Sequence, residues 1–275
     1  MDIGARTDVG RVRGNNEDSF KFVPELNLFI LSDGMGGEAH GEVASSMAVE
    51  KIAAHCTEAQ KHSDLPLASE ARPDLSPMTN RLVSAVQLAN HAIYEKAKSN
   101  PSHKGMGATV VAVCVDGQRM SVANVGDSRV YLLRAGELQQ LTEDHSLVAE
   151  QVRRGILSRQ QAEESKMQSV LLRAMGIDPD IEIDADEHLL MDGDVVLLCS
   201  DGLDRMASDP EIASTILTHP GAQASADNLV QLALENGGQD NVTVILFRYE
   251  LRSENLFTRV WNWLNAPLDS QSPAR

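Results

Sequence analysis

The chain has few cysteines. There are three in 275 residues, Cys56, Cys114 and Cys199, and none of them forms a CxxC pair. An odd number of widely spaced cysteines argues against a disulfide framework and favours a reducing compartment. Residues 1–10 also lack the apolar core of a signal peptide, so we expect a cytoplasmic protein.

Basic residues are scarce as well. Lys and Arg total 24 against 40 Asp and Glu, which gives a formal net charge of −16. This balance argues against binding to nucleic acid or to an anionic membrane surface, since both need a basic face. The acidic excess has two interpretations: a solvated surface, or carboxylates that converge on cations. Only the positions of the acids can separate these interpretations.

Long hydrophobic runs are absent, and aromatic residues make up only 4% of the chain. No stretch approaches the ~20 apolar residues of a membrane-spanning helix, so we expect no transmembrane segment. Hydrophobic residues still account for 42%, which is enough for a sizeable core of aliphatic side chains and methionine.

The chain does contain short apolar runs that alternate with amphipathic stretches. The apolar runs predict strands at 27–32, 181–188, 194–200 and 242–249, and an antiparallel meander with tight turns over 108–141. Helical spacing predicts helices at 42–58, 78–99, 144–154, 158–166, 209–219 and 225–236. The helices come in pairs between groups of strands, which favours antiparallel sheets covered by helices over a doubly wound parallel sheet.

Residues 251–275 form a separate tail behind a domain that we expect at 1–250. Phe257, Val260, Trp261 and Leu264 could share one face of a short amphipathic helix. Such a helix would either pack on the domain or dock against a partner or a membrane interface.

Three aspartates lie at the ends of predicted buried strands. Asp33 follows NLFILS, Asp201 follows VVLLCS, and Asp240 precedes VTVILF. Each one alone is typical of a turn. Several rigid, partly buried carboxylates together repel one another unless a cation neutralises them, and Mg²⁺ and Mn²⁺ prefer such oxygen ligands. Three in this setting favour a metal site.

The N-terminal segment offers a further acidic pair and an arginine. Glu17 and Asp18 alone are typical of a polar loop. Arg13 could clamp a phosphate with its planar guanidinium, or simply pair with a surface acid.

The order of the motifs resembles the metal-dependent protein phosphatases (the PPM, or type 2C, serine/threonine phosphatases), especially their bacterial branch. The resemblance runs from about residue 8 to residue 249 and keeps the family's order. The stretches that carry it are DVGRVRGNNEDSF (8–20), LSDGMGGEAHGEVAS (31–45), GMGATVVAV (105–113), ANVGDSRVYLLRAGELQQLTEDHSLV (123–148), LLRAMG (171–176), DVVLLCSDGL (194–203) and GGQDNVTVI (237–245).

The resemblance implies a fold and a set of metal ligands. The fold is α+β, a four-layer sandwich of two central antiparallel β-sheets flanked by pairs of α-helices. Asp33 would bridge two Mn²⁺ or Mg²⁺ ions. The residues that complete the two ligand sets are Glu17 and the carbonyl of Gly34 for one ion, and Asp201 and Asp240 for the other. Asp127 matches an aspartate linked to a third, weaker metal.

The resemblance also implies the catalytic roles. Asp18 would orient metal-bound water, Arg13 would bind the substrate phosphate, and residues 145–169 would form a mobile flap beside the site. A metal-bridged hydroxide would hydrolyse phosphoserine and phosphothreonine on proteins and so counteract a bacterial Ser/Thr protein kinase, itself an expected substrate. We expect a monomer.

Two positions depart from the family pattern. Eukaryotic members carry a histidine, the proposed general acid, two residues after the bridging aspartate, and here that position is Met35. The family often shows Asp-Gly-x-x-Asp, whereas this chain reads Asp201-Gly202-Leu203-Asp204-Arg205. The second aspartate comes one position early, which argues against a metal role for Asp204 and weakens the third site.

Two other functions remain as alternatives. A pseudophosphatase would keep the fold and only bind a partner, but all the core acids are present. A phosphatase of a partner-switching pathway with an anti-sigma antagonist would usually carry additional sensor domains, for which this chain has no room.

Overall fold

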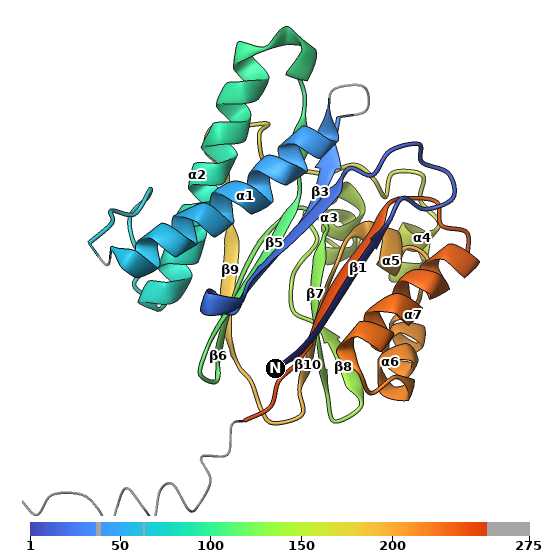
Figure 1. Cartoon of the computed structure of the whole chain (residues 1–275). Helices are drawn as coiled ribbons and strands as arrows, with labels where there is room; N and C mark the ends of the chain where they lie inside the picture. The colour runs from blue at the N-terminus through green and yellow to red at the C-terminus, as the bar shows by residue number, and fades with distance from the viewer. Residues whose placement is uncertain (37–39, 63, 252–275) are drawn as a thin grey trace, which may run out of the picture.

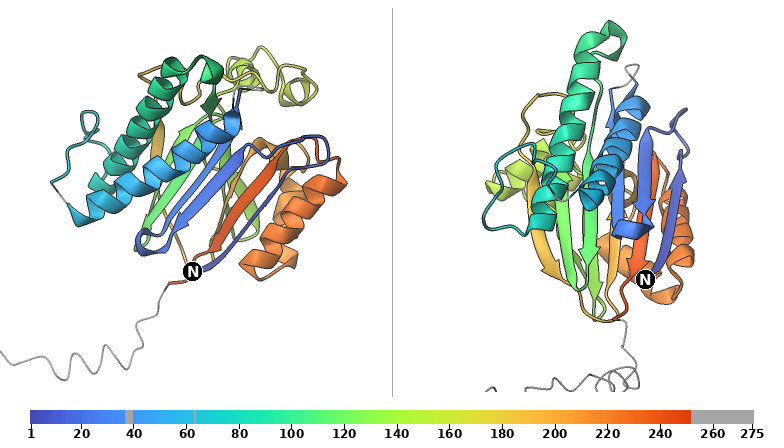
Figure 2. Two further views of the ribbon diagram at one scale, coloured as in Figure 1. Left: turned by 45° about the horizontal axis from the view of Figure 1, so that its top comes forward. Right: turned by 60° about the vertical axis from the view of Figure 1, so that its left-hand side comes forward.

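The computed structural model of the chain describes residues 1–36, 40–62 and 64–251. Two antiparallel β-sheets pack face to face, and a pair of helices covers the outer face of each (Figures 1 and 2). The predicted fold class, an α+β four-layer sandwich, is therefore confirmed. The helix predicted within 251–275 falls outside the described residues.

One sheet carries six strands in the order β2-β3-β5-β6-β9, with β4 paired to β3. Its strands are β2 (Asp18–Val23), β3 (Leu28–Met35), β4 (Gly107–Ala108), β5 (Val110–Asp116), β6 (Arg119–Val125) and β9 (Asp184–Leu189). The other sheet has five strands in the order β1-β11-β10-β7-β8. Its strands are β1 (Asp2–Asp8), β7 (Arg129–Arg134), β8 (Glu137–Gln140), β10 (Val195–Cys199) and β11 (Val242–Arg248).

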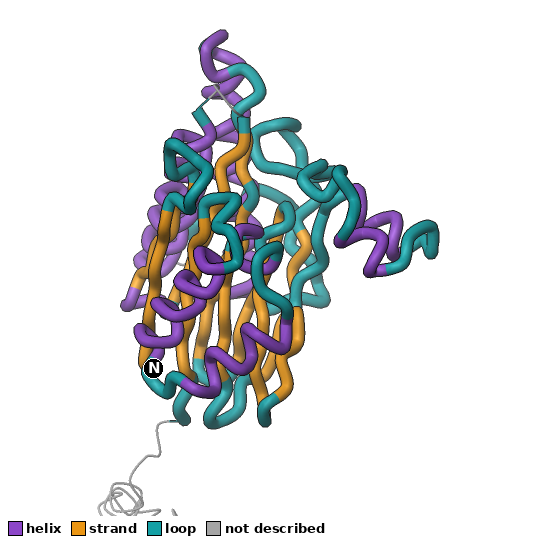
Figure 3. The backbone as a smooth tube through the Cα atoms, turned by 90° about the vertical axis from the view of Figure 1, so that its right-hand side faces the viewer, coloured by secondary structure: helices purple, strands orange, loops and turns teal. Residues whose placement is uncertain are grey.

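Two helix pairs form the outer layers. The helices α1 (Gly41–Lys61) and α2 (Pro77–Ser99) cover the six-stranded sheet. The helices α6 (Asp209–Thr218) and α7 (Ala222–Glu235) cover the five-stranded sheet, which lies behind them in Figure 3. The short elements are the helices α3 (Leu147–Arg153), α4 (Arg159–Glu163) and α5 (Asp201–Asp204), and the 3-10 turns η1 (Pro24–Leu26) and η3 (Pro101–His103).

Local sequence explains where the long helices begin and end. At the start of α2, the Ser76 hydroxyl accepts a hydrogen bond from the Thr79 amide, and Pro77 occupies the first helical position. The helix ends at Asn100 because the following proline disfavours the α conformation there. At α6, Ser208 and Glu211 form a reciprocal capping box.

Three apolar layers hold the sandwich together. One lies between α1, α2 and the six-stranded sheet, one between the two sheets, and one between the five-stranded sheet and α5, α6 and α7. In the middle layer, Phe29 of β3 stacks on Phe247 of β11, with ring centroids 4.4 Å apart. Full burial of such a side chain contributes about 1.5–3 kcal/mol, so this pair fixes one sheet against the other.

The sequence analysis was wrong about the strands over 108–141. It predicted one continuous meander, but β5 and β6 form a hairpin in one sheet while β7 and β8 form a hairpin in the other. The turn at Gly126-Asp127 is the crossover between the sheets. Gly126 has a φ of 105°, and a Cβ there would lie 2.6 Å from the Thr109 side chain, so the crossover requires glycine.

None of the described helices is long and apolar enough to cross a lipid bilayer.

Candidate metal centre

The predicted aspartates lie at strand ends of both sheets and are close enough to influence one another electrostatically. The strand β3 has this end at the top in Figure 1. Asp18 begins β2 and lies opposite Asp33 of β3 in the strand register. Asp201 lies two residues after the end of β10 and begins α5, and Asp240 lies two residues before β11. The strand β3 continues through Asp33 to Met35, so Asp33 lies within the strand and not after it.

The backbone around Asp33 is held on both sides. Its amide donates to the Thr109 hydroxyl at 3.0 Å, and its carbonyl accepts from the Thr109 amide at 2.8 Å. The Asp33 carboxyl from one sheet and the Asp201 carboxyl from the other lie close enough for each to affect the pKa of the other.

Burial and mutual repulsion oppose ionisation of these acids. Burial, and then the neighbouring charge of Asp18, raises the pKa of Asp33 well above its ordinary value. Burial raises the pKa of Asp18 to about 7, although a hydrogen bond from Ser200 lowers it in part. Burial raises the pKa of Glu17 and Asp201 as well. The charge of a divalent cation would favour the ionised form of all four acids and so oppose these shifts.

Two buried oxygens at this centre lack a partner. Oδ1 of Asp18 and Oδ1 of Asp201 accept no hydrogen bond from any described residue. An unpaired buried carboxylate oxygen is costly, and a hard cation satisfies it well. The donor set therefore fits a divalent metal.

Arginines lie against several of these carboxylates. Arg13, in the loop between β1 and β2, donates to Asp240 at 2.7 Å, and its side chain is 56% exposed. Arg205 contacts Asp201 at 2.6 Å and Asp127 at 3.2 Å. With the side chains so placed, no three His, Cys, Asp or Glu residues within the described ranges form a ready-made metal-ligand group. The acids are brought together, but part of their charge is neutralised by these cations.

Glu17 and Gly34 are positioned by a close approach of β3 to the start of α1. The Gly34 amide donates to the Glu17 carbonyl at 3.1 Å. A Cβ on Gly34 would lie 2.2 Å from the Gly41 carbonyl oxygen, and a Cβ on Gly41 would lie 2.1 Å from Oε2 of Glu17. Glycine is therefore required at both positions, and Gly41 is a site residue that the sequence analysis missed.

The sequence analysis also missed two polar residues that support the acids. Ser200 donates to Oδ2 of Asp18 at 2.8 Å and accepts from the Thr243 amide at 3.0 Å. The side-chain oxygen of Asn241 accepts from the Glu17 amide at 2.8 Å. Ser200 directly precedes Asp201 in the sequence, and Asn241 directly follows Asp240. This position next to a predicted ligand is the only signal in the sequence that points to them.

Asp204 is buried and is paired with an arginine. It forms an ion pair with Arg129 at 3.0 Å, and Arg129 also binds Asp144 at 2.7 Å. The argument against a metal role for Asp204 therefore has a physical basis in this pairing.

The family model for protein phosphatase 2C matches residues 11–239. The chain belongs to the protein phosphatase 2C family. It is similar to the serine/threonine phosphatase stp of Listeria welshimeri, with 37% identity over 90% of this chain and 95% of that protein.

Solved structures of phosphatases agree with this assignment. The crystal structure of the Mycobacterium tuberculosis serine/threonine phosphatase PstP superposes with a TM-score of 0.79, at 37% identity over 90% of this chain and 98% of that one. A second structure, of the PstP catalytic domain with two manganese ions, gives a TM-score of 0.74 at 37% identity over 89% and 96%. The predicted membership of the PPM family is confirmed.

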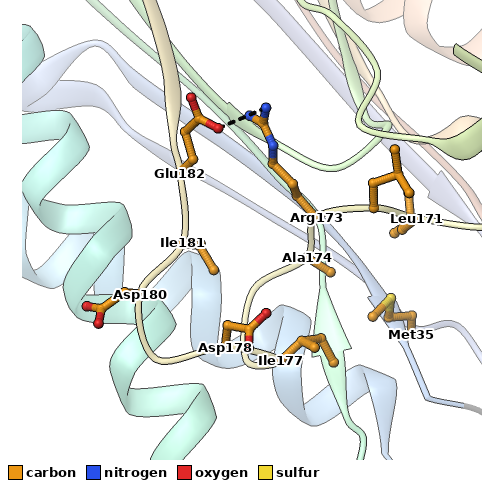
Figure 4. Close-up of a pocket in the computed structure, with 10 residues that line it drawn as sticks. Met35, Leu171, Arg173, Ala174, Ile177, Asp178, Asp180, Ile181 and Glu182 are labelled. Atoms are coloured by element: carbon orange, nitrogen blue, oxygen red, sulfur yellow. Dashed lines mark ion pairs between the residues drawn. The ribbon is translucent and has the colours of Figure 1, made fainter. Parts of the chain in front are cut away.

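This phosphatase has a pocket of about 340 Å³ beside the metal centre (Figure 4). Met35, two residues after Asp33, forms one wall, so the general acid of eukaryotic relatives has no counterpart there. The opposite walls come from the segment between the predicted flap and β9, namely Leu171, Leu172, Arg173, Ala174, Ile177, Asp178, Asp180, Ile181 and Glu182.

Hydrogen bonds to its backbone hold the loop that forms the acidic rim of this pocket. The side chain of Asn90 on α2 donates to the carbonyls of Asp178 and Pro179, both at 2.9 Å, and accepts from the Gly176 amide at 2.7 Å. Arg173 pairs with Glu182 at 2.9 Å. Among the described residues, Asp178 and Asp180 have no cationic partner, so they present two free carboxylates on a fixed loop.

Proposed function

We propose that this phosphatase hydrolyses phosphoserine and phosphothreonine on proteins with two divalent cations, Mn²⁺ or Mg²⁺. The ligands would come from Glu17, Asp33, the Gly34 carbonyl, Asp201 and Asp240, with Asp33 serving both ions. The observation that carries the proposal is the meeting of buried, mutually repelling carboxylates from both sheets at one end of the sandwich. The match to a structure that holds two manganese ions supports it.

When bound, the ions lower the pKa of water toward neutrality and neutralise the charge of the phosphoryl group. The protein's own residues then bind the substrate phosphate and orient the attacking water. Arg13 at the exposed mouth binds the substrate phosphate, because its guanidinium can exchange Asp240 for phosphate oxygens. Oδ1 of Asp18, which has no described protein partner, accepts a hydrogen bond from the attacking water and holds it in line.

The proton for the leaving serine or threonine oxygen comes from solvent water. Met35 occupies the position at which eukaryotic relatives have a histidine, and a thioether cannot donate a proton. This reaction uses no covalent enzyme intermediate.

The pocket beside Met35 receives the residues that flank the phosphorylated side chain. Its apolar walls fit a hydrophobic neighbour, and Asp178 and Asp180 fit a basic one. The substrates are proteins phosphorylated by a Ser/Thr kinase, the kinase included, and the enzyme acts as a monomer.

A phosphothreonine peptide tests the proposal. Wild-type protein should release phosphate with Mn²⁺ and lose that activity in EDTA, and Asp240→Asn should be sharply impaired. Asp186→Asn, an exposed substitution on β9, serves as the matched control and should behave as wild type. A folded wild-type protein without turnover in any divalent cation would contradict the enzymatic function and favour a binding module.

A further inference from the structure

Arg205 lies where the family pattern has its second aspartate, and its contacts are unusual for that position. Its Nη2 atom lies 2.6 Å from Oδ2 of Asp201 and 3.2 Å from Oδ2 of Asp127. The side chain is 22% exposed, so this charge is largely removed from water. One guanidinium thus joins a ligand of the proposed two-ion centre to the aspartate linked to a third metal.

A second arginine nearby, Arg129, also forms ion pairs with two acids. Arg129 pairs with Asp144 and Asp204, and Arg205 pairs with Asp127 and Asp201. Asp127 is buried, with 9% of its side chain exposed, and Arg205 at 3.2 Å is the cationic partner that the structure gives it. The Asp127 carboxylate therefore depends on Arg205 for its compensating charge.

We propose that Arg205 is a built-in cation at the third metal position, so that Asp127 binds no ion and this phosphatase holds two ions, not three. A guanidinium stays charged at every physiological pH and, unlike a metal, cannot dissociate. A divalent ion at Asp127 would be repelled by it at short range. The proposal rests on the proposed two-ion centre.

Arg205 also reaches the flap. Its Nη2 atom donates to the carbonyl of Gln168 at 3.4 Å, within the segment 145–169. The same guanidinium therefore joins the flap to Asp127 and Asp201.

Counting bound Mn²⁺ by equilibrium dialysis and metal analysis tests the proposal without an activity assay. Wild type and Arg205→Lys, which keeps the positive charge, should each bind two ions. Arg205→Ala should gain a third ion, and Arg205→Ala combined with Asp127→Asn should lose it again. Arg154→Ala, an exposed arginine after α3, is the control and should bind two ions.

The outcomes separate this proposal from the proposed function. Three ions in wild type, or two in both wild type and folded Arg205→Ala, would overturn the role of Arg205. No bound Mn²⁺ in folded wild type would overturn the two-ion centre itself. If Arg205→Ala does not fold by circular dichroism, Asp127→Asn alone decides: an unchanged count of two supports the proposal, and a fall from three to two overturns it.

Discussion

The carboxyl group of Asp18 is buried beside other acids, so the fold without metal favours its neutral form. Its pKa rises from 3.8 to about 7 in the folded protein. Between these values the folded protein holds a proton that the unfolded chain has released, and the free energy of unfolding therefore falls as the pH rises. Above the raised pKa, the folded protein bears the full cost of the buried charge.

We predict that Asp18→Asn stabilises the metal-free protein at pH 7.5. In EDTA, wild type should melt at a lower temperature at pH 7.5 than at pH 5, and Asp18→Asn should reduce that difference by several degrees, since roughly 1 kcal/mol corresponds to about 2–4 °C for a chain of this size. Thermal unfolding followed by circular dichroism measures this. An equal pH dependence in both proteins would contradict it.

The proposed role of Arg13 in binding the substrate phosphate can also be tested by substitution. Loss of a charge-assisted hydrogen bond costs about 1.5–3 kcal/mol, so Arg13→Ala should reduce kcat/KM for a phosphothreonine peptide roughly 10- to 100-fold. Arg13→Lys should recover only part of it, because lysine cannot bind phosphate bidentately. Arg11→Ala is the control in the same loop, where the Arg11 side chain binds the Leu234 carbonyl. Equal losses in both alanine variants would exclude a specific phosphate contact.

At the scale of elements, the close approach of β3 to α1 makes the stability of the fold sensitive to substitution of Gly34. A Cβ on Gly34 would overlap the Gly41 carbonyl, whereas a Cβ on Gly14 would meet no atom within 4 Å. Gly34→Ala should therefore destabilise the fold by about 1–3 kcal/mol and weaken Mn²⁺ binding, whereas Gly14→Ala should do neither. Urea unfolding and Mn²⁺ titration of both variants provide the comparison. Tight Mn²⁺ binding by Gly34→Ala would contradict the expectation that a displaced backbone at residue 34 disturbs the metal site.

The fixed loop that carries Asp178 and Asp180 should set peptide preference. The double change Asp178→Asn and Asp180→Asn should raise KM about two- to fivefold for phosphopeptides with a basic residue beside the phosphothreonine, because exposed ion pairs are weak. It should leave kcat unchanged and have no effect on peptides with acidic neighbours. Asp186→Asn is the matched control. A uniform change across all peptides would contradict a recognition role for the pocket.

Most elements could be predicted from the sequence, and the exceptions have a common cause. The two longer strands that the sequence analysis did not predict, β1 and β2, lie at sheet edges, and their alternation is interrupted by charged and half-buried residues. The third, β4, has only two residues and is too short to leave a pattern. The sequence analysis predicts a hairpin turn at Gly126, because Gly-Asp favours a hairpin turn and a crossover between sheets alike. Which sheet a strand joins depends on packing far away in the chain, and local pattern does not encode it.

At the scale of the whole molecule, the positions of the acids could be predicted better than the arginines that pair with them. Asp33, Asp201 and Asp240 were found because buried strands lead into or out of them, and the structure brings them together. The contacts of Arg205 with Asp127 and Asp201 could not be predicted, because they depend on how α5 lies against the crossover between the sheets. The roles of the site residues and the domain limit at 250 stay predictions.

The position of β11 has a consequence for biosynthesis. This strand is made last, yet it fits between β10 and β1, and among the described strands β1 has no other neighbour. During translation the first strand must therefore wait for the last before either can pair, and Asp240 arrives with it. A ribosome-bound chain that stops short of β11 has Glu17, Asp18 and Asp33 but no finished active site, so we expect enzymatic activity only after β11 has been made.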